Sequence, residues 1–355
     1  MGNYAAQLET LIETIIKQGG SDLHLTAGYH PTIRVTGFLI PLVAQELLTP
    51  TDTEGFSDVL LSPANKERFL KEKEIDFSYS YKDDTVRFRG NCSFSRDAIS
   101  IALRLIPKTI RSFEELGLPT ALADFARRQQ GFFLVVGPVG HGKSTTLAAM
   151  IELINTERPD HIVTIEDPIE YIFEPKKSMI NQREVRVDTL DFHRALNQLF
   201  RQDVDVVMIG EMRTPETIGT AVTAAETGHL VLSTLHTNNA SQTIDRIIDS
   251  FPPESQAQVR VQLAGSLIGI FSQRLVSRVS GGLVPAYELL INNKAIANLI
   301  REGRTHEIDS VIETGSDYGM MDMNRSLAEL VRKGEITVEE ARIHSLNPAI
   351  LDKLI

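Results

Sequence analysis

The chain has 355 residues, 42% of them hydrophobic and 23% charged, with a formal net charge of −11. This length favours two folded domains, the composition excludes a disordered chain or a fibrous repeat, and the acidic balance argues against nucleic-acid binding. A single cysteine excludes a disulfide scaffold, and since neither a membrane span of roughly 20 apolar residues nor a secretory signal is found, we expect a cytoplasmic protein with no transmembrane segment.

Residues 1–108 are predicted to form a small α+β domain. Apolar residues recur every three or four positions over residues 7–17, which predicts an amphipathic helix. Short β-rich runs with turn residues between them follow, at residues 22–25, 32–36, 75–81, 86–94 and 98–105. A proline-bounded linker, residues 109–118, then separates this domain from the rest of the chain.

Residues 119–355 have a different pattern, in which continuous buried-strand runs alternate with helical stretches. The strand runs are 132–136, 162–165, 204–209 and 230–235, and the helical stretches are 143–155, 192–202, 216–227 and 241–250. Such alternation predicts an α/β domain with a parallel sheet covered on both faces. A long helix over 254–275 is expected next, followed by C-terminal helices from about residue 293 to 355.

A glycine-rich motif lies between a predicted strand and a predicted helix. Residues 137–144 match G-x-x-x-x-G-K-[ST] in the strand–loop–helix setting that this phosphate-binding pattern requires. Glycines let backbone N–H groups surround phosphate oxygens, Lys143 would reach the β- and γ-phosphates, and Ser144 would hold Mg²⁺. The predicted nucleotide-binding residues of this loop are Gly137, Pro138, Val139, Gly140, His141, Gly142, Lys143, Ser144 and Thr145.

Carboxylates follow two other predicted strands. Glu211 comes after 204–209, and Glu166 and Asp167 come after 162–165. Ligands of open α/β sheets bind beyond the carboxyl ends of the strands, where a carboxylate can polarise an attacking water or hold a metal through water. We therefore predict Glu211 as the catalytic base and as a Mg²⁺ ligand through water. Only one of Glu166 and Asp167 needs to face the nucleotide, and both also suit caps or solvated turns.

Two histidines flank the predicted strand 230–235. His236 follows its carboxyl end, where a polar side chain can sense a γ-phosphate, and His229 precedes its start. A lone histidine at a strand end is more often a hydrogen-bonded structural residue. On these residues alone both interpretations stay open, with His236 as the better candidate.

Taken together, these motifs resemble those of the type IV pilus retraction ATPases of the PilT kind, within the secretion ATPase superfamily. The resemblance extends over nearly the whole chain. It rests on residues 19–28, 137–144, 164–170, 181–185, 210–213, 223–231, 233–237 and 298–302.

This resemblance implies a RecA-like P-loop ATPase core, a smaller N-terminal PAS-like α+β domain and a helical C-terminal region. It also implies a homo-hexameric ring that binds ATP and Mg²⁺ and works in pilus retraction, peripheral to the inner membrane at the pilus platform protein. By resemblance, Glu166 and Asp167 form the acidic box, Glu211 is the Walker B glutamate, and His229 and His236 form the histidine box. Glu166, Glu211 and His236 are then predicted as catalytic, and Asp167 and His229 as nucleotide-binding.

Three arginines of the N-terminal domain suit an anion clamp. Arg87 and Arg89 lie two positions apart in a predicted strand and face the same side, and Arg104 closes another strand. An arginine supplied to a transferring γ-phosphate is worth about 10³–10⁵ in rate, whereas the alternative is a set of solvated edge-strand arginines. The resemblance favours catalytic roles in this clamp for Arg89 and Arg104, and Arg87 is predicted to bind the nucleotide.

Four positions depart from the family pattern. Val139 and His141 replace a usual Thr and Ser in the phosphate loop, Thr214 replaces an acidic residue, and Ala297 replaces an arginine of the C-terminal motif. The two loop positions contribute mainly backbone, so we expect ATP binding to survive. Residues 299–301 are the expected coupling element to the pilus platform, and Ala297 bears on that coupling rather than on hydrolysis.

Three alternatives compete with pilus retraction. The first is a pilus assembly or type II secretion ATPase of the same superfamily, which usually carries a four-cysteine metal module and a longer N-terminal region. The second is a nucleic-acid translocase on a RecA-like core, which the acidic balance opposes. The third is a non-hydrolysing nucleotide-dependent interaction protein, which the intact Lys143, Ser144, Glu166 and Glu211 oppose.

Overall fold

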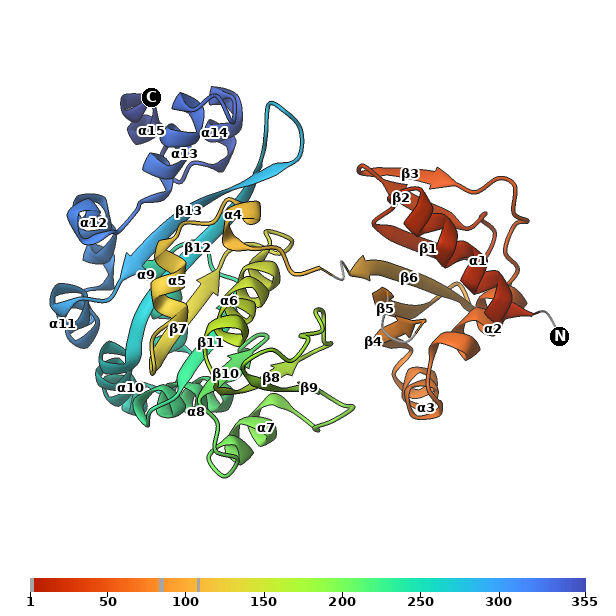
Figure 1. The fold of residues 1–355 in the computed structure, drawn as a ribbon, viewed down its shortest axis with the longest axis horizontal. Coiled ribbons are helices and arrows are strands. Elements are labelled where there is room, and N and C mark those ends of the chain that lie inside the picture. Colours follow the sequence, from red (N-terminus) through yellow and green to blue (C-terminus); the bar gives the residue numbers. More distant parts are fainter. Residues whose placement is uncertain (1–2, 83–85, 107–108) are drawn as a thin grey trace. The chain divides into compact units, whose positions relative to one another are not determined.

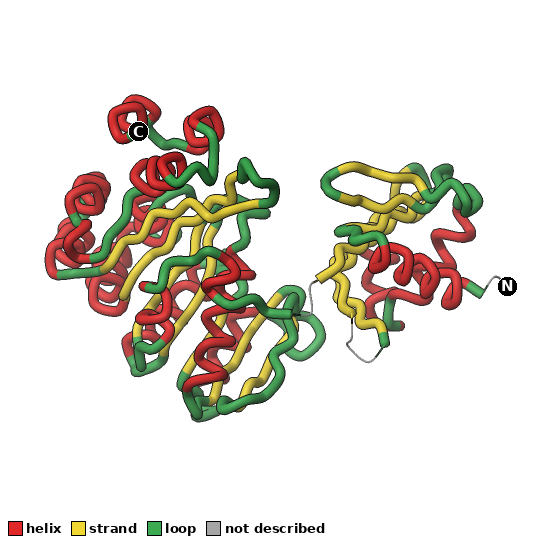
Figure 2. Tube along the Cα trace, turned by 45° about the horizontal axis from the view of Figure 1, so that its top comes forward, coloured by secondary structure: helices red, strands yellow, loops and turns green. Residues whose placement is uncertain are grey.

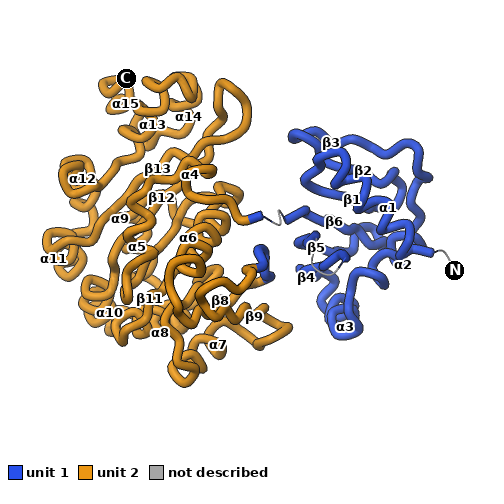
Figure 3. The backbone as a smooth tube through the Cα atoms, viewed as in Figure 1, with its two compact units in different colours: residues 1–109, 168–172 blue, residues 110–167, 173–355 orange. Residues whose placement is uncertain are grey.

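The computed structural model describes residues 3–82, 86–106 and 109–355, which form two compact units. One unit comprises residues 1–109 together with 168–172, and the other comprises residues 110–167 and 173–355 (Figure 3). Within the described ranges, no helix combines the length and the apolar character that crossing a bilayer requires.

The first unit is built on an antiparallel sheet in the order β3-β2-β1-β6-β5-β4 (Figure 1). Its strands are β1 (Asp22–Thr26), β2 (Thr32–Val35), β3 (Phe38–Pro41), β4 (Glu74–Tyr81), β5 (Val86–Ser95) and β6 (Ala98–Ile106). Its helices are α1 (Tyr4–Lys17), α2 (Pro50–Leu60) and α3 (Pro63–Glu72). The predicted helix and five strands are confirmed with small shifts at their ends, whereas β3, α2 and α3 were not predicted.

An apolar stripe of α1 closes the core of this unit. Leu8, Leu11, Ile12 and Ile15 recur at helical spacing and are buried in one cluster with the inward residues of the sheet. The same cluster includes Cys92, and burial raises the pKa of that thiol to about 12. Cys92 is therefore a core residue and is not placed for nucleophilic chemistry.

The second unit contains a seven-stranded sheet in the order β13-β12-β7-β11-β10-β8-β9 (Figure 1). Its strands are β7 (Gly131–Val136), β8 (His161–Glu166), β9 (Met179–Glu184), β10 (Val206–Ile209), β11 (Leu230–Leu235), β12 (Leu267–Ser277) and β13 (Leu283–Ile291). All neighbours pair in parallel except β12 and β13. The predicted parallel sheet is thus confirmed, with one antiparallel strand added at an edge.

Helices cover both faces of this sheet, as Figures 1 and 2 show. The crossover from β7 to β8 runs along the sheet in the opposite direction to those from β10 to β11 and from β11 to β12. Right-handed connections then place α6 on one face and α8 and α9 on the other. The helices up to the sheet's end are α4 (Phe113–Leu116), α5 (Ala121–Ala126), α6 (Lys143–Glu157), α7 (Phe192–Leu199), α8 (Pro215–Glu226), α9 (Ala240–Asp249) and α10 (Pro253–Ser266). The C-terminal helices are α11 (Lys294–Glu302), α12 (Ile308–Thr314), α13 (Met323–Arg332), α14 (Val338–His344) and α15 (Pro348–Leu354).

The long helix predicted over 254–275 is wrong in its second half. Helix α10 ends at Ser266, and the chain continues as β12, which pairs with β7 on one side and β13 on the other. At Gly269 a side chain would collide with the carbonyl oxygen of Leu290, 2.9 Å from an ideal Cβ, so this close strand approach needs glycine. Apolar runs of this length do not distinguish a buried helix from a buried strand, and here pairing on both sides decides for the strand.

Candidate active site

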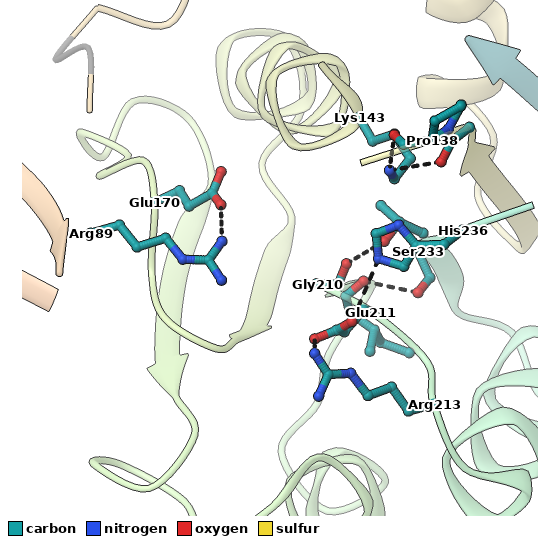
Figure 4. A network of polar contacts seen from close by, with 12 residues as sticks. Arg89, Pro138, Lys143, Glu170, Gly210, Glu211, Arg213, Ser233 and His236 are labelled. Carbon is teal, nitrogen blue, oxygen red and sulfur yellow. Dashed lines mark hydrogen bonds and ion pairs between the residues drawn. The ribbon is translucent and has the colours of Figure 1, made fainter. Parts of the chain in front are cut away.

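The phosphate loop follows β7 and leads into α6, at the edge where the parallel strands end. Lys143 is buried, and its Nζ donates hydrogen bonds to the carbonyl oxygens of Gly137 at 2.9 Å and Pro138 at 2.8 Å (Figure 4). Ser144 is exposed on the first turn of α6, where amide groups and the helix dipole favour an anion. The predicted loop therefore has its charged group and its hydroxyl at a helix N-terminus.

Gln273 of β12 holds the phosphate loop from the side, a role that sequence reasoning missed. Its buried amide donates to the carbonyl oxygen of His141 at 2.9 Å and accepts from the Thr146 hydroxyl at 2.6 Å. Gly137 has a φ of +141°, and a Cβ there would lie 2.3 Å from the Gln273 carbonyl oxygen. Only glycine fits this contact. In the sequence, the polar pair Ser272 and Gln273 follows the apolar run of β12, and this was the signal that could have indicated the role of Gln273.

The His141 side chain also braces the loop against β12. Its Nδ1 accepts a hydrogen bond from the Leu275 amide at 2.9 Å, and its ring meets that of His344 edge to face. Burial lowers the pKa of His141, and the nearby charges of His344, Arg274 and Lys143 lower it further. A neutral ring can accept the amide bond, so this departure from the family pattern has a structural role.

Glu211 lies just beyond the end of β10, beside two basic side chains. One carboxylate oxygen is 2.6 Å from Arg213 Nη2, and the other is 3.7 Å from His236 Nε2 (Figure 4). Hydroxyls of β11 fix the preceding turn, because Thr234 Oγ1 donates to the Gly210 carbonyl oxygen at 2.6 Å. The Glu211 side chain is only 17% exposed, so its carboxylate is held in a defined orientation at the same sheet edge as Lys143.

His236 follows β11 at this edge, as predicted. Burial lowers its pKa, the Lys143 and Arg213 charges lower it further, and Glu211 opposes them. The imidazole is therefore neutral at neutral pH and has one donor and one acceptor nitrogen. The structure thus brings Lys143, Glu211 and His236 to one end of neighbouring strands.

Glu166 and Asp167 have different environments. Glu166 is buried at the end of β8, and its Oε1 accepts from the Thr164 hydroxyl at 2.7 Å and from Gln182 Nε2 at 3.2 Å. Asp167 lies 4.0 Å from Arg186 Nη2. Glu166 therefore belongs to the interior of the same edge, and Asp167 forms a more peripheral ion pair.

His229 is not brought to the phosphate loop. It precedes β11, whereas His236 follows it, and a six-residue strand spans about 20 Å. Its Nδ1 lies 3.0 Å from the Ala224 carbonyl oxygen, and its ring packs edge-on against Phe200. Within one chain, His229 therefore does not share a site with Lys143.

The predicted clamp arginines project from one face of the first unit's sheet, because Arg89 and Arg104 are cross-strand partners. Arg104 Nε donates to Asp22 Oδ1 at 2.9 Å, and Asp22 is buried on the neighbouring strand β1. Burial alone would raise the pKa of Asp22, but the hydrogen bonds from Ser21 and Arg104 and the nearby positive charge together outweigh it, so the pKa is lowered. Arg104 is thus anchored at one end while its side chain is 68% exposed.

The other two arginines have partners within the same unit. Arg87 Nη1 donates to the Ser80 hydroxyl at 2.9 Å, and Arg89 Nη1 donates to Glu170 Oε1 at 3.3 Å (Figure 4). Glu170 belongs to the segment 168–172 that groups with this unit. All three arginines stay candidates for a clamp, and each is already oriented by an oxygen acceptor.

Comparisons with known proteins show what the chain is similar to. The sequence pattern of the type II/IV secretion system proteins matches residues 4–335. The type IV pilus retraction ATPase PilT of Pseudomonas aeruginosa is 44% identical over 326 residues, which are 92% of this chain and 94% of that protein. A twitching motility protein of Neisseria gonorrhoeae is 44% identical over 318 residues, or 89% of this chain and 84% of that protein.

A solved structure has the same fold. The crystal structure of the pilus retraction motor PilT with bound ADP matches with a TM-score of 0.89 and 45% identity, covering 97% of this chain and 98% of that one. The two-sheet architecture described above is therefore one in which a nucleotide has been observed in a relative.

Proposed function

This chain belongs to the type II/IV secretion system protein family, and from that premise we propose that it is a Mg²⁺-dependent ATPase that powers type IV pilus retraction. One observation carries the proposal: Lys143, Glu211 and His236 lie together at the carboxyl edge of the parallel sheet, beside the N-terminus of α6. That edge is where open α/β sheets bind ligands. The part of the proposal that concerns the pilus, and retraction as the direction of the mechanical work, comes from the names of the similar proteins.

The chain's own residues supply binding and proton handling. Lys143 exchanges the carbonyl oxygens of Gly137 and Pro138 for phosphate oxygens when ATP binds. Glu211, held by Arg213 and beside a neutral His236, orients the attacking water and accepts its proton. His236 presents an uncharged donor toward the phosphoryl group.

The donor set suits Mg²⁺, a hard cation that prefers oxygen ligands and keeps several waters. The Ser144 hydroxyl would hold it directly and the Glu211 carboxylate through water, while the ion neutralises phosphate charge. Among the residues that the structure describes, no group of three or more His, Cys, Asp or Glu side chains forms a metal cage.

A ring of six copies, peripheral to the inner membrane on the cytoplasmic side, completes the proposal. In it Arg89 and Arg104, with Arg87, act as the clamp on a nucleotide phosphate, and the pilus platform protein is the partner. Of the C-terminal coupling element, Leu299 and Ile300 are buried in the core, so only Arg301 is exposed for contact. The domains proposed are 1–108 and 119–355, joined by the linker 109–118.

Deleting the gene in its host should produce hyper-piliated cells whose pili extend but do not retract. Fluorescent labelling of pili in living cells measures this directly, with the intact gene restored as the control. A retraction motor removes pilins from the fibre, so its loss leaves fibres in place. Bald cells would instead identify an assembly motor, and unchanged pili would remove the pilus role.

Specific ATPase activity should fall on dilution to a proven monomer, by about 10³-fold if an arginine of a neighbouring copy completes the site. Turnover is measured across concentrations, with the oligomeric state followed by sedimentation at each point. An Arg104→Lys chain serves as the comparison, because lysine keeps the charge but loses the planar fork. Constant activity through the monomer range would show that each copy acts alone.

A further inference from the structure

A buried carboxyl group lies behind the catalytic edge and has no part in the chemistry described above. Glu288 of β13 is 5% exposed, and its Oε1 accepts a hydrogen bond from the Ala240 amide at 2.7 Å. Burial raises the pKa of Glu288 to about 8, and Asp309 and Asp322 add to the rise. A buried, mostly neutral carboxyl group is costly unless it is hydrogen-bonded, so its single well-formed bond points to what it does.

Glu288 holds the segment that carries His236. That segment, residues 236–239, joins β11 to α9, and Ala240 is the first residue of α9. Helix α9 already has its own cap, since Asn239 Oδ1 accepts from the Gln242 amide at 3.0 Å. The Glu288 bond is therefore additional to ordinary capping, and it fixes the chain four residues after His236.

A second anchor comes from the neighbouring strand. Ser272 of β12 is the cross-strand partner of Glu288, so the two side chains lie on the same face of the sheet. The Ser272 hydroxyl donates to the Asn238 carbonyl oxygen at 2.8 Å. One cross-strand pair thus holds two successive points of the segment, at Asn238 and Ala240.

The segment is also fixed internally. Thr243 Oγ1 donates to the Asn239 carbonyl oxygen at 2.6 Å and lies 2.6 Å from the Thr237 hydroxyl. Thr237 is buried, whereas the His236 side chain next to it is 46% exposed. The imidazole is therefore accessible, whereas the backbone of the segment that carries it is fixed by buried hydrogen bonds.

We propose that Glu288 is a positioning residue for His236, acting through its hydrogen bond to Ala240 and together with Ser272. The inference rests on the proposed ATPase function for its kinetic test. Its structural half, that Glu288 orders residues 236–240, is independent of that function.

The test compares Glu288→Met, which keeps the volume but removes the acceptor, with Glu288→Gln, which keeps an oxygen acceptor. In the full-length protein we expect Glu288→Met to lower kcat about 10- to 100-fold, with KM for ATP changed by less than about threefold, because a misplaced group loses rate before it loses binding. Glu288→Gln should stay within about threefold of the original kcat. Hydrogen exchange of residues 236–243 should quicken in Glu288→Met only.

A double mutant separates positioning from general damage. In a His236→Ala background, adding Glu288→Met should change kcat by less than about twofold, because residues that act as a unit are not additive. Ser272→Ala should also lower kcat, by a smaller factor than Glu288→Met. The matched control is Thr305→Val, which removes the buried hydroxyl that donates to Asp245 of α9 at 2.6 Å and should lower the melting temperature without changing kcat.

Three results would overturn the proposal. The first is that Glu288→Met lowers kcat by the same factor with and without the His236 side chain, and the second is that Glu288→Gln lowers kcat as much as Glu288→Met does. The third is that hydrogen exchange of residues 236–243 is unchanged in Glu288→Met. If Glu288→Met does not fold, Ser272→Ala decides by the same comparisons. An inactive original chain would count against the ATPase proposal instead, and the exchange measurement would still decide whether Glu288 orders the segment.

Discussion

Steady-state phosphate release should fall about 10²–10⁴-fold when Glu211 is replaced by Gln, while nucleotide still binds. The substitution keeps the size of the side chain and a partner for Arg213, but it removes the base that accepts a proton from water. Because the charged group lost is not one that grips the triphosphate, the affinity for ATP should change little. Phosphate release and binding of a fluorescent nucleotide analogue measure the two effects separately.

The matched control for this substitution is Glu226→Gln, since Glu226 is an exposed glutamate on α8 whose partner is Gln262. It should leave turnover unchanged. A second comparison is Glu166→Gln, because Glu166 is the other carboxylate of this edge. Full activity in Glu211→Gln combined with a large loss of activity in Glu166→Gln would instead identify Glu166, at the end of β8, as the catalytic base.

Local signals explain why much of this edge could be predicted. The phosphate loop is contiguous in sequence, and Glu211 and His236 each come directly after a buried apolar run. Parallel strands end at one edge, so identifying the strands was enough to bring these side chains together. The prediction needed no knowledge of strand order, and the observed order places β11 beside both β7 and β10.

The supports of the site could not be predicted in the same way. Gln273 and Glu288 act through partners more than 40 residues away, at His141 and Ala240. Those pairings depend on β12 being a strand, and its apolar run was interpreted as part of a helix. The five-residue connection to β13 contains Gly281 and Gly282, both with positive φ, which is a hairpin signal that favours the strand.

In the first unit too, the local sequence pattern predicts which face of a strand a side chain lies on but not which side chain it contacts. Two-residue spacing correctly places Arg87 and Arg89 on one face. That Asp22 anchors Arg104 follows only from the pairing of β1 with β6, which are 82 residues apart at this contact. Helices α2 and α3 were missed although Thr49 and Ser62 each precede a proline and cap a helix, because their apolar stripes are weak.

Replacing Lys143 by Met should remove most of the nucleotide affinity as well as the activity. Methionine keeps a buried apolar chain of similar length but lacks the ammonium group that would contact the phosphates. A charge-assisted hydrogen bond is worth about 1.5–3 kcal/mol, and 1.4 kcal/mol is a tenfold change in affinity. Losing two such bonds to phosphate oxygens therefore weakens ADP binding by about 100-fold or more.

Thermal unfolding with and without ADP measures this loss. A ligand at 100 times its dissociation constant stabilises the folded protein by about 2.7 kcal/mol, and a 100-fold weaker site at the same concentration gains only about 0.4 kcal/mol. The matched control is Lys177→Ala, a change at a lysine beyond α6 whose Nζ lies 3.5 Å from the Glu157 carbonyl oxygen, and it should keep the full shift. The Lys143 ammonium group donates to carbonyl oxygens of the loop itself, at Gly137 and Pro138, so the ADP-free stability should change less than the ligand effect. An ADP-induced shift that survives in Lys143→Met would mean that other residues of this chain hold the nucleotide phosphates.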